Sequence, residues 1–391
     1  MLRPLSPQPG EYIRGHAGRL SLWNGFLSAE ELLVFLCRRA KKERGAGFSS
    51  HVYQLMAPFS ELDPQRYLTE HSLLPFCRIG TREDDVFDYH GPTGGQSRSA
   101  WMQPKDGAYL CPDCVASDER TRGFSYWRAF HQLPGIDACA AHGKALAVVK
   151  RADAFDRPPG SWADARPVND QLVSLRTTPA VDRYETIAYA FMSRGHRVHR
   201  LVAAQCIGMR VAEIGVQTER NGSQFTLADC IREAFPAAWL EAHYPRLYGS
   251  EKSKKIVAVN AACSGSIVDG IVYAMALAAT FSTSMEAINV FYATQGAAPE
   301  VRVSAIKSVK LSTRRDRLLP CYIANEGRVT CIAKALGVSH VTVSYQLRSV
   351  GLPPLGRVPE LDRQRVIAFL SRASESELDH WAAAGSNIDA L

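Results

Sequence analysis

Four residues in the second quarter of the chain have the types and the spacing of metal ligands. These residues are Cys111, Cys114, Cys139 and His142. The first two lie in the motif CPDC and the last two in the motif CAAH, with two residues between the members of each pair. The two motifs are separated by 24 residues. A tetrahedral zinc ion takes paired ligands from short turns of this kind. Because sulfur and nitrogen ligands fill all four positions, no position is left for a water molecule. The pattern therefore predicts one structural Zn2+ ion.

Two other interpretations of these four residues stay open. Cysteine also serves as a small buried hydrophobic residue, so the motifs can be unrelated parts of a reduced core. A disulfide framework is disfavoured, because the seven other cysteines stand singly in apolar stretches such as LLVFLCRRA and no apolar signal sequence precedes them. This usage of cysteine indicates a reducing cytoplasm.

The sequence around the four residues resembles a known family. The motifs that carry the resemblance are PGEYIRGHAGRL near the start, HSLLPFCRIG before the first ligand pair, and GFSYWRAFHQLPGIDACAAHGKAL through the second. They are similar to motifs of the TniQ/TnsD family of transposon target-selection proteins over about the first 146 residues. The resemblance implies that the four residues ligate zinc.

Two details of the motif region bear on the number of ions. Some relatives carry a second cysteine pair soon after the histidine, whereas KALAVVKRADAF follows here without a cysteine, so we expect one zinc ion. His131 lies inside the motif, but four ligands are already present. We expect His131 to make a hydrogen bond or to pack beside Trp127 instead.

The elements that must position these residues are predicted to be helices. An apolar stripe covers residues 12–26, and Ser28 followed by Glu31 before an apolar run is the signature of a capping box. Further helices are expected at 184–192, 197–208 and 227–242, the last ended or kinked by Pro236.

Composition shifts suggest where the chain divides. Residues 81–107 are polar and rich in Gly, Pro and Asp, which predicts a loop or arm, and 150–170 form a second break. We expect a mainly α, multi-domain helical protein with an inserted zinc-finger module and a C-terminal helix-turn-helix. The expected domains are a TniQ-like helical region at 1–106, the zinc-finger module at 107–150, a helical middle domain at 171–300, and a basic helix-turn-helix region with a tail at 301–391.

The most apolar stretch, 256–281, has to be weighed as a membrane span. Polar residues interrupt it, among them Asn260 and Asp269, so no apolar run of about 18 residues remains. We expect no membrane segment and a buried helix at 267–280.

The segment RVTCIAKALGVSHVTVSYQLRSVGLP predicts a helix-turn-helix. Residues 329–336 form its first helix, Gly337 supplies the turn, and Ser339 caps a second helix that Gly351 ends. The residues expected to pack in its core are Ile332, Ala333, Leu336, Val343 and Leu347.

Charge supports double-stranded DNA as the partner of this segment. The whole chain has a net charge of +7, and residues 301–357 contain ten basic residues against Asp316 and Glu326, a local charge of +8. Placed in a major groove, the second helix would present His340, Val341, Thr342, Ser344, Tyr345 and Arg348. Phosphate contacts are expected from Arg314, Arg315 and Arg317. The alternative is a helix-turn-helix that contacts only protein.

The complete motifs of three enzyme classes are absent from the sequence. There is no G-x-x-x-x-G-K-[ST] motif of an ATPase and no H-x-E partner for a deaminase P-C-x-x-C pair. Ser304 and Lys307 have the spacing of an acyl-enzyme dyad, but the accompanying K-T-G is missing. We therefore expect a protein that is not an enzyme.

The resemblance and the two motifs together predict target-site selection in DNA transposition. The resemblance implies that the zinc-bearing part recruits an AAA+ ATPase of the TnsC type, in a bacterial cytoplasm and associated with the nucleoid. Two alternatives stay open, an adaptor docking on a CRISPR RNA-guided effector and a zinc-containing transcriptional regulator. A homodimer stays open as well, because one helix-turn-helix usually reads only a short half-site.

Overall fold

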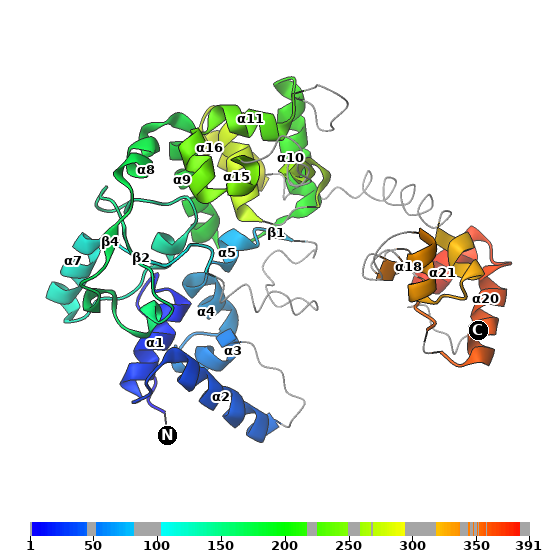
Figure 1. Cartoon of the computed structure of the whole chain (residues 1–391), viewed down its shortest axis with the longest axis horizontal. Coiled ribbons are helices and arrows are strands. Elements are labelled where there is room, and N and C mark those ends of the chain that lie inside the picture. The colour runs from blue at the N-terminus through cyan, green and yellow to red at the C-terminus, as the bar shows by residue number, and fades with distance from the viewer. Residues whose placement is uncertain are drawn as a thin grey trace. The chain divides into compact units, whose positions relative to one another are not determined.

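The computed structural model of the protein forms two compact units, Met1–Ala297 and Ala298–Leu391. Helices dominate both units (Figure 1), as predicted. The structure describes residues 2–44, 52–81, 103–216, 225–248, 259–266, 269–293, 318–336, 343–344, 347, 350, 352–356 and 358–383.

The first unit begins with the two helices that the sequence predicted, α1 (Ile13–Trp23) and α2 (Ala29–Arg44). Three further helices follow them, α3 (Val52–Met56), α4 (Pro64–His71) and α5 (Leu74–Cys77). The Ser28 hydroxyl accepts a hydrogen bond from the Glu31 N–H at 3.1 Å. The Glu31 carboxylate in turn accepts from the Leu27 N–H at 2.8 Å. The start of α2 is thus capped from both sides, one residue away from the ideal capping box.

Two glycines let α1 approach other segments closely. A Cβ atom on Gly15 would lie 2.7 Å from Cβ of Trp127, and one on Gly18 would lie 1.9 Å from the carbonyl oxygen of Phe155. Both positions belong to the GHAGRL part of the first motif. Their lack of a side chain therefore serves the packing of α1 against one segment that lies between the two metal motifs and another that follows them.

Gly18→Ala is expected to lower the free energy of unfolding by about 1–3 kcal/mol, because a backbone oxygen has to move to admit the methyl group. Gly208 in the helix Arg200–Glu213 is the matched control, since a Cβ atom added there would have no neighbour within 4 Å. Gly208→Ala should raise the free energy of unfolding by about 0.5–1 kcal/mol. Urea denaturation of both variants checks this, and equal effects would contradict the packing argument.

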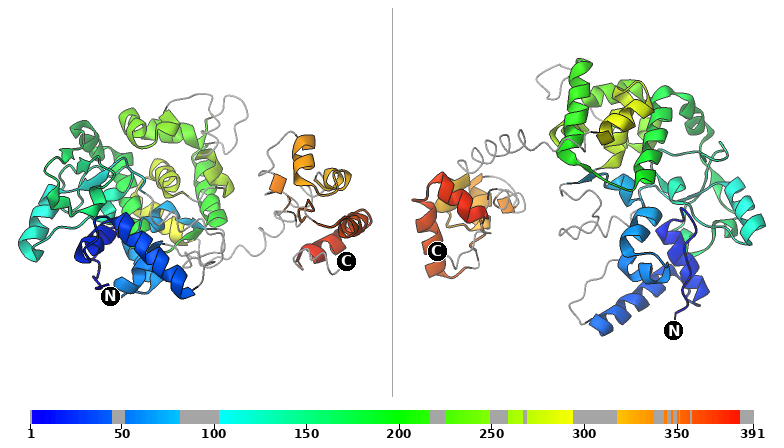
Figure 2. Two further views of the ribbon diagram at one scale, coloured as in Figure 1. Left: turned by 60° about the horizontal axis from the view of Figure 1, so that its bottom comes forward. Right: turned by 180° about the vertical axis from the view of Figure 1, so that it is seen from behind.

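A buried helix lies at the centre of the remaining part of the unit. This is α15 (Gly270–Thr280), which corresponds to the helix predicted at 267–280, and its residues are buried from Gly270 to Ala278. The helices that pack against it include α5 together with α9 (Pro179–Arg194), α10 (Arg200–Glu213), α11 (Leu227–Ala234) and α16 (Ser284–Ala293) (Figure 2). Within the described part of the chain, no helix is long and apolar enough to cross a membrane.

Two predicted helix boundaries can be compared with the structure. Pro236 ends α11 as expected, and α12 (Ala237–His243) begins directly after it. The start predicted at residue 197 is wrong, because Val198–His199 forms strand β5, which pairs in parallel with β1 (Gly80–Thr81). The start of α10 therefore depends on pairing with a strand that lies more than 100 residues earlier in the chain. The helix propensity of the local sequence gives no sign of this pairing.

Short elements complete the first unit. An antiparallel sheet has the order β2 (Ala108–Leu110), β3 (Ala147–Val149) and β4 (Arg166–Pro167). The short helices are α7 (Pro112–Arg122), α8 (Asp170–Ser174) and α13 (Pro245–Tyr248), with single 3-10 turns at Ala57–Phe59, Ala129–Gln132, Ala154–Asp156, Pro159–Ser161, Leu175–Thr177 and Ala261–Ser264.

One hydrophobic core runs through the first unit from Tyr12 to Tyr292. It includes Cys111, Cys114 and Cys139 together with residues of α1, α9 and α15. The segments predicted at 1–106, 107–150 and 171–300 therefore all contribute to one core.

His16 in α1 forms a buried polar link whose tautomer follows from its partners. Its Nε2 lies 2.6 Å from the carbonyl oxygen of Leu5, which can only accept, so Nε2 carries the proton. Its Nδ1 lies 2.6 Å from the hydroxyl of Tyr67 and accepts from it. Burial lowers the pKa of His16 to about 3, so the ring stays neutral in the folded protein.

The neutral His16 is expected to make the protein less stable as the pH falls. Below about pH 6.5 the unfolded chain binds a proton at His16 that the folded protein excludes, so stability is lost as pH falls from that value towards about 3. Between about pH 7.5 and 5.5 this amounts to about 1.4 kcal/mol. His16→Gln should remove that part of the slope in urea denaturation curves. If the stability of the unaltered protein and that of His16→Gln depended on pH in the same way, the neutral state assigned to His16 would be contradicted.

The second unit has a core of its own. Its helices include α18 (Val329–Leu336), α20 (Glu360–Leu370) and α21 (Glu375–Ala383). Ile332, Ala333, Val343 and Leu347 are buried in this core, as the helix-turn-helix pattern requires. The expectation for Leu336 is wrong, because its side chain is 40% exposed at the end of α18. Gly337, Ser339 and Gly351 lie outside the described residues.

Candidate metal centre

The first pair of predicted ligands lies where a strand passes into a helix. Cys111 follows β2 directly and is the residue before the first turn of α7, and Cys114 lies in that turn. Pro112 occupies the first helical position, where its missing N–H leaves no hydrogen bond unmade. The strand-to-helix junction thus brings both sulfur atoms to one end of α7.

The second pair lies in a tight turn. The N–H of Cys139 donates to the carbonyl of Lys144 at 2.9 Å, and the N–H of Gly143 donates to the carbonyl of Cys139 at 2.7 Å. Gly143 has a φ of 65°, a conformation that favours glycine. The turn is closed by a bridge between Ala138 and Ala145. It therefore directs the side chains of Cys139 and His142 to the same side.

Pairing of β2 with β3 brings the two turns together. Leu110, the neighbour of Cys111, lies opposite Ala147, which follows the second turn. The Gln132 side chain extends this pairing on the other edge of β2: its Oε1 accepts from the Tyr109 N–H at 2.9 Å, and its Nε2 donates to the Tyr109 carbonyl at 2.7 Å. Gln132 thus replaces a neighbouring strand, a role that the sequence did not reveal although the residue lies in the HQLPG motif.

Four of the six separations between the ligand atoms are close to those of a tetrahedral site. Nδ1 of His142 lies 3.5 Å from Sγ of Cys111, 3.4 Å from Sγ of Cys114 and 3.5 Å from Sγ of Cys139. The sulfurs of Cys114 and Cys139 are 3.6 Å apart. Bond lengths of about 2.3 Å to sulfur and about 2.0 Å to nitrogen place tetrahedral ligands about 3.5–3.8 Å apart.

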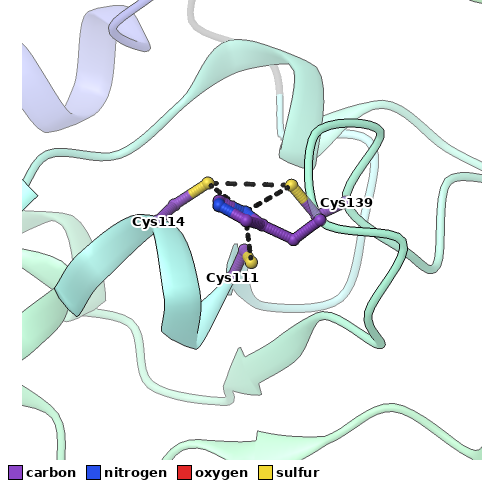
Figure 3. A group of neighbouring side chains, drawn as sticks. Cys111, Cys114 and Cys139 are labelled. Atoms are coloured by element: carbon purple, nitrogen blue, oxygen red, sulfur yellow. Dashed lines mark hydrogen bonds between the residues drawn. The ribbon is translucent and has the colours of Figure 1, made fainter. Parts of the chain in front are cut away.

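All four ligand atoms lie within 4.8 Å of one another, and Figure 3 shows the three cysteine side chains converging from α7 and from the turn. The three cysteines are buried, whereas His142 is exposed and closes the cluster towards solvent. The residues present therefore fit one metal ion of the size and ligand preference of zinc.

Polar neighbours favour a thiolate at Cys139 alone, because the hydrogen bond with Cys139 raises the pKa of the Cys114 thiol and burial raises the pKa of the Cys111 thiol. A hydrogen bond from Cys114 lowers the pKa of the Cys139 thiol, and hydrogen bonds from His131 and His142 lower it further. His131 is itself buried, 5% exposed, and burial lowers its pKa. A neutral His131 can therefore donate to the Cys139 sulfur without being a ligand, as a residue beside a metal ligand commonly does.

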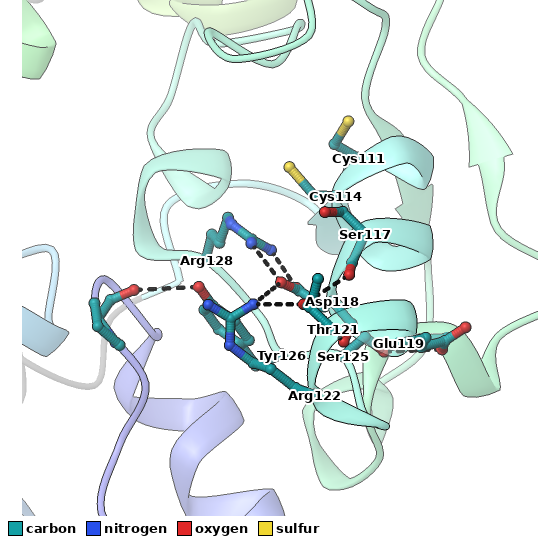
Figure 4. Close-up of polar contacts among 12 residues, drawn as sticks. Cys111, Cys114, Ser117, Asp118, Glu119, Thr121, Arg122, Ser125, Tyr126 and Arg128 are labelled. Atoms are coloured by element: carbon teal, nitrogen blue, oxygen red, sulfur yellow. Dashed lines mark hydrogen bonds and ion pairs between the residues drawn. The ribbon is translucent and has the colours of Figure 1, made fainter.

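A buried ion-pair network joins α7 to the residues that follow it. The Asp118 carboxylate is 1% exposed and accepts two hydrogen bonds from the Arg128 guanidinium, at 2.7 and 2.9 Å. Arg122 donates a third at 3.1 Å. Figure 4 shows Arg128 and Arg122 both directed at the Asp118 carboxylate. The Arg128 guanidinium also lies over the Tyr126 ring, 4.3 Å from its centroid. These contacts fix α7 to the segment that precedes the second ligand pair.

The segment around Trp127, which lies between the two ligand pairs, also contacts the N-terminal part of the chain. The Tyr12 N–H donates to the carbonyl of Trp127 at 2.6 Å, and the Ala129 N–H donates to the carbonyl of Gly10 at 2.9 Å. The Trp127 indole donates to the carbonyl of Arg157 at 2.8 Å. The motifs PGEY and YWR, more than 100 residues apart, therefore lie side by side.

The predicted DNA contacts are placed only in part. Ser344 is half-buried in the second unit, near the buried Val343. The other predicted positions lie outside the described residues, namely His340, Val341, Thr342, Tyr345, Arg348, Arg314, Arg315 and Arg317. The metal ligands and the segment predicted to form a helix-turn-helix belong to different units.

Comparison with known proteins identifies the region that contains the metal cluster. The model of the TniQ family matches residues 2–146, a range that includes all four cluster residues and the contacts between α1 and Trp127. The chain matches none of the curated proteins with which it was compared.

Proposed function

Because the model of the TniQ family matches residues 2–146, we propose that the chain is a transposition-associated protein of this family and that it selects the DNA site at which a transposon inserts. The observation that carries the proposal is the family match over a domain whose motif residues make the contacts described above. In this function the protein is an adaptor without a catalytic site of its own.

The metal is assigned a structural role in this proposal. Cys111, Cys114, Cys139 and His142 would hold one Zn2+ ion, which supplies folding energy and no reaction step. The ion would tie α7 to the turn at Cys139, and the Asp118 network would transmit that constraint to the N-terminal segment at Gly10–Tyr12.

DNA reading is assigned to the second unit. Two observations support this, the local charge of +8 in residues 301–357 and the burial of Ile332, Ala333, Val343 and Leu347 at helix-turn-helix spacing. A helix presented in this way enters the major groove, while arginines outside it contact phosphates.

ATP hydrolysis would come from a partner, because the sequence has no phosphate-binding G-x-x-x-x-G-K-[ST] loop. We propose an AAA+ regulator of the TnsC type as that partner, recruited by the first unit. The first unit would then bind the ATPase, and the second unit would bind DNA.

Binding of the full-length protein to a randomised duplex DNA library at two salt concentrations tests the proposal. Sequencing of the retained DNA should reveal an enriched motif that survives the higher salt, and Tyr345→Ala with Arg348→Ala should abolish the enrichment. Motif-free binding that disappears at the higher salt would indicate phosphate contacts alone. That result would overturn direct site selection and favour placement by another complex, such as an RNA-guided effector.

A further inference from the structure

Three thiolates give the metal centre a negative charge that the protein has to offset. Cysteine binds zinc as a thiolate, so three cysteines and one neutral histidine leave one negative charge in excess of the divalent ion. The three cysteines are buried. A buried charge is costly unless hydrogen bonds or an opposite charge lie close to it. Groups that reach the sulfur atoms from outside the ligand set therefore affect how well the ion is held.

Backbone N–H groups supply part of this compensation. The N–H groups of Asp113 and Cys114, at the start of α7, form hydrogen bonds with the sulfur of Cys111. The N–H of His142 forms one with the sulfur of Cys139. These contacts follow from the two turns themselves and do not depend on particular side chains.

Two side chains from one short segment add to these contacts. Arg128 directly precedes the 3-10 turn Ala129–Gln132, and His131 lies in that turn. Residues three positions apart lie on the same side of a 3-10 turn. The His131 ring forms a hydrogen bond with the sulfur of Cys139, and the charge of Arg128 acts on Cys114. One segment thus reaches a sulfur atom in each of the two ligand pairs.

The position of Arg128 beside Cys114 follows from α7. Cys114 and Asp118 are four residues apart on this helix, so they lie on the same face, one turn apart. The buried Asp118 carboxylate holds the Arg128 guanidinium with two hydrogen bonds, at 2.7 and 2.9 Å (Figure 4). The hydrogen bond with Cys139 and burial raise the pKa of the Cys114 thiol, and the charge of Arg128 opposes that rise. Asp118 therefore fixes a positive charge close to a metal ligand.

The position of His131 is fixed by the backbone of its turn. The His131 side chain is buried, and its carbonyl accepts a hydrogen bond from the Lys105 ammonium at 3.2 Å. Lys105 also donates to the carbonyl of Ile136 at 2.5 Å. The adjacent Gln132 is bonded to both the N–H and the carbonyl of Tyr109. These contacts hold the turn, and with it the His131 ring, against the cluster.

Two other cations near the centre are less suited to this role. Lys144 pairs with Asp113 at 2.9 Å, but its side chain is 66% exposed. Arg122 bonds the same carboxylate as Arg128, yet its side chain is 41% exposed, against 23% for Arg128. Water screens a charge more strongly the more exposed it is. Of these three cations, Arg128 therefore acts most strongly on the buried sulfur atoms.

We propose that Arg128 and His131 offset the charge of the zinc-bound thiolates and thereby set how tightly the site holds its ion. Arg128 acts through its charge on Cys114, and His131 acts through its N–H group on Cys139. Neither residue is a ligand. The proposal rests on the structural zinc site proposed above, and it is independent of target-site selection. It gives a physical role to the motifs YWR and HQLPG, which contain these two residues.

Competition between the full-length protein and a chelator of known zinc affinity, at neutral pH, tests the role of Arg128. Arg128→Gln removes the charge and should weaken zinc binding about 10- to 100-fold. Arg128→Lys keeps the charge and should recover most of this loss, although both variants lose the paired hydrogen bonds with Asp118. Arg122→Gln is the matched control: it removes another hydrogen bond to the same carboxylate and should leave the zinc affinity close to that of the unaltered protein.

Cobalt(II) bound in place of zinc tests the role of His131, because the sulfur-to-cobalt charge-transfer band reports the electron density at the thiolates. His131→Leu removes the N–H donor and should move this band to lower energy, whereas the ligand-field bands should keep their tetrahedral form. His131→Gln keeps an N–H donor and should move the band less. Circular dichroism of the loaded proteins checks that each variant is folded.

Several results would overturn the proposal. If Arg128→Lys bound zinc as weakly as Arg128→Gln, the contacts with Asp118 would matter and the charge would not. Zinc binding by Arg128→Gln as tight as that by Arg122→Gln, or an unchanged charge-transfer band in His131→Leu, would also contradict it. An unaltered protein that holds no zinc would overturn the metal assignment together with this proposal, whereas the other results leave that assignment intact.

Discussion

Cys111→Ser is expected to remove the bound metal and to unfold the N-terminal unit. Metal analysis should show one equivalent of zinc in the unaltered protein and close to none in the variant, with a large loss of soluble protein. Binding at structural zinc sites contributes about 10–16 kcal/mol to folding, and three remaining ligands recover only part of it. Since Cys111 packs in the same core as α1 and α9, the loss should reach the whole unit.

Cys331→Ser is the matched control for this result. Cys331 is an exposed cysteine in α18, in the second unit and outside the cluster, so its substitution should leave both metal content and solubility unchanged. Removal of the metal from the unaltered protein by a chelator should reproduce the effect of Cys111→Ser. A soluble Cys111→Ser protein that keeps a full equivalent of metal would contradict the assignment of this ligand.

Asp118→Ala is expected to lower the free energy of unfolding by about 3 kcal/mol. The substitution leaves the guanidinium of Arg128 without the carboxylate that accepts two of its hydrogen bonds. Loss of one partner of a buried pair costs about 3–5 kcal/mol, and the 23% exposure of Arg128 favours the lower end of that range. Urea denaturation with metal present throughout measures the change.

Asp106→Ala is the control for Asp118→Ala. Asp106 pairs with Lys150 at 3.1 Å, but the two side chains are 89% and 66% exposed, so the pair lies in water. Its removal should change stability by less than about 1 kcal/mol. Equal losses in the two variants would show that the buried network does not support α7.

Local sequence patterns predicted the parts of the structure that depend on nearby residues. The spacing of Cys111, Cys114, Cys139 and His142 predicted a cluster that the structure brings within 4.8 Å. Ser28 caps α2, and Pro236 separates α11 from α12, because caps and proline act within a few residues.

Features that depend on distant partners were not predictable in this way. The β2–β3 pairing and the bonds from Gln132 to Tyr109 join residues more than 20 positions apart, and the HQLPG motif indicates no such role by itself. Leu336 fits the apolar pattern of α18 yet is 40% exposed, because the pattern does not say where the core ends. The start of α10 depends on β1, which lies far away in the sequence.

The positions of the four metal ligands also set the order in which the protein assembles. The turn at Cys139 and the start of α7 each depend on contacts a few residues apart, so both can form early and independently. The complete set of ligands exists only after β2 has paired with β3 across a long intervening segment that includes α7. A newly made chain therefore completes the site only when these two distant segments meet, and binding of the ion then stabilises the core around them.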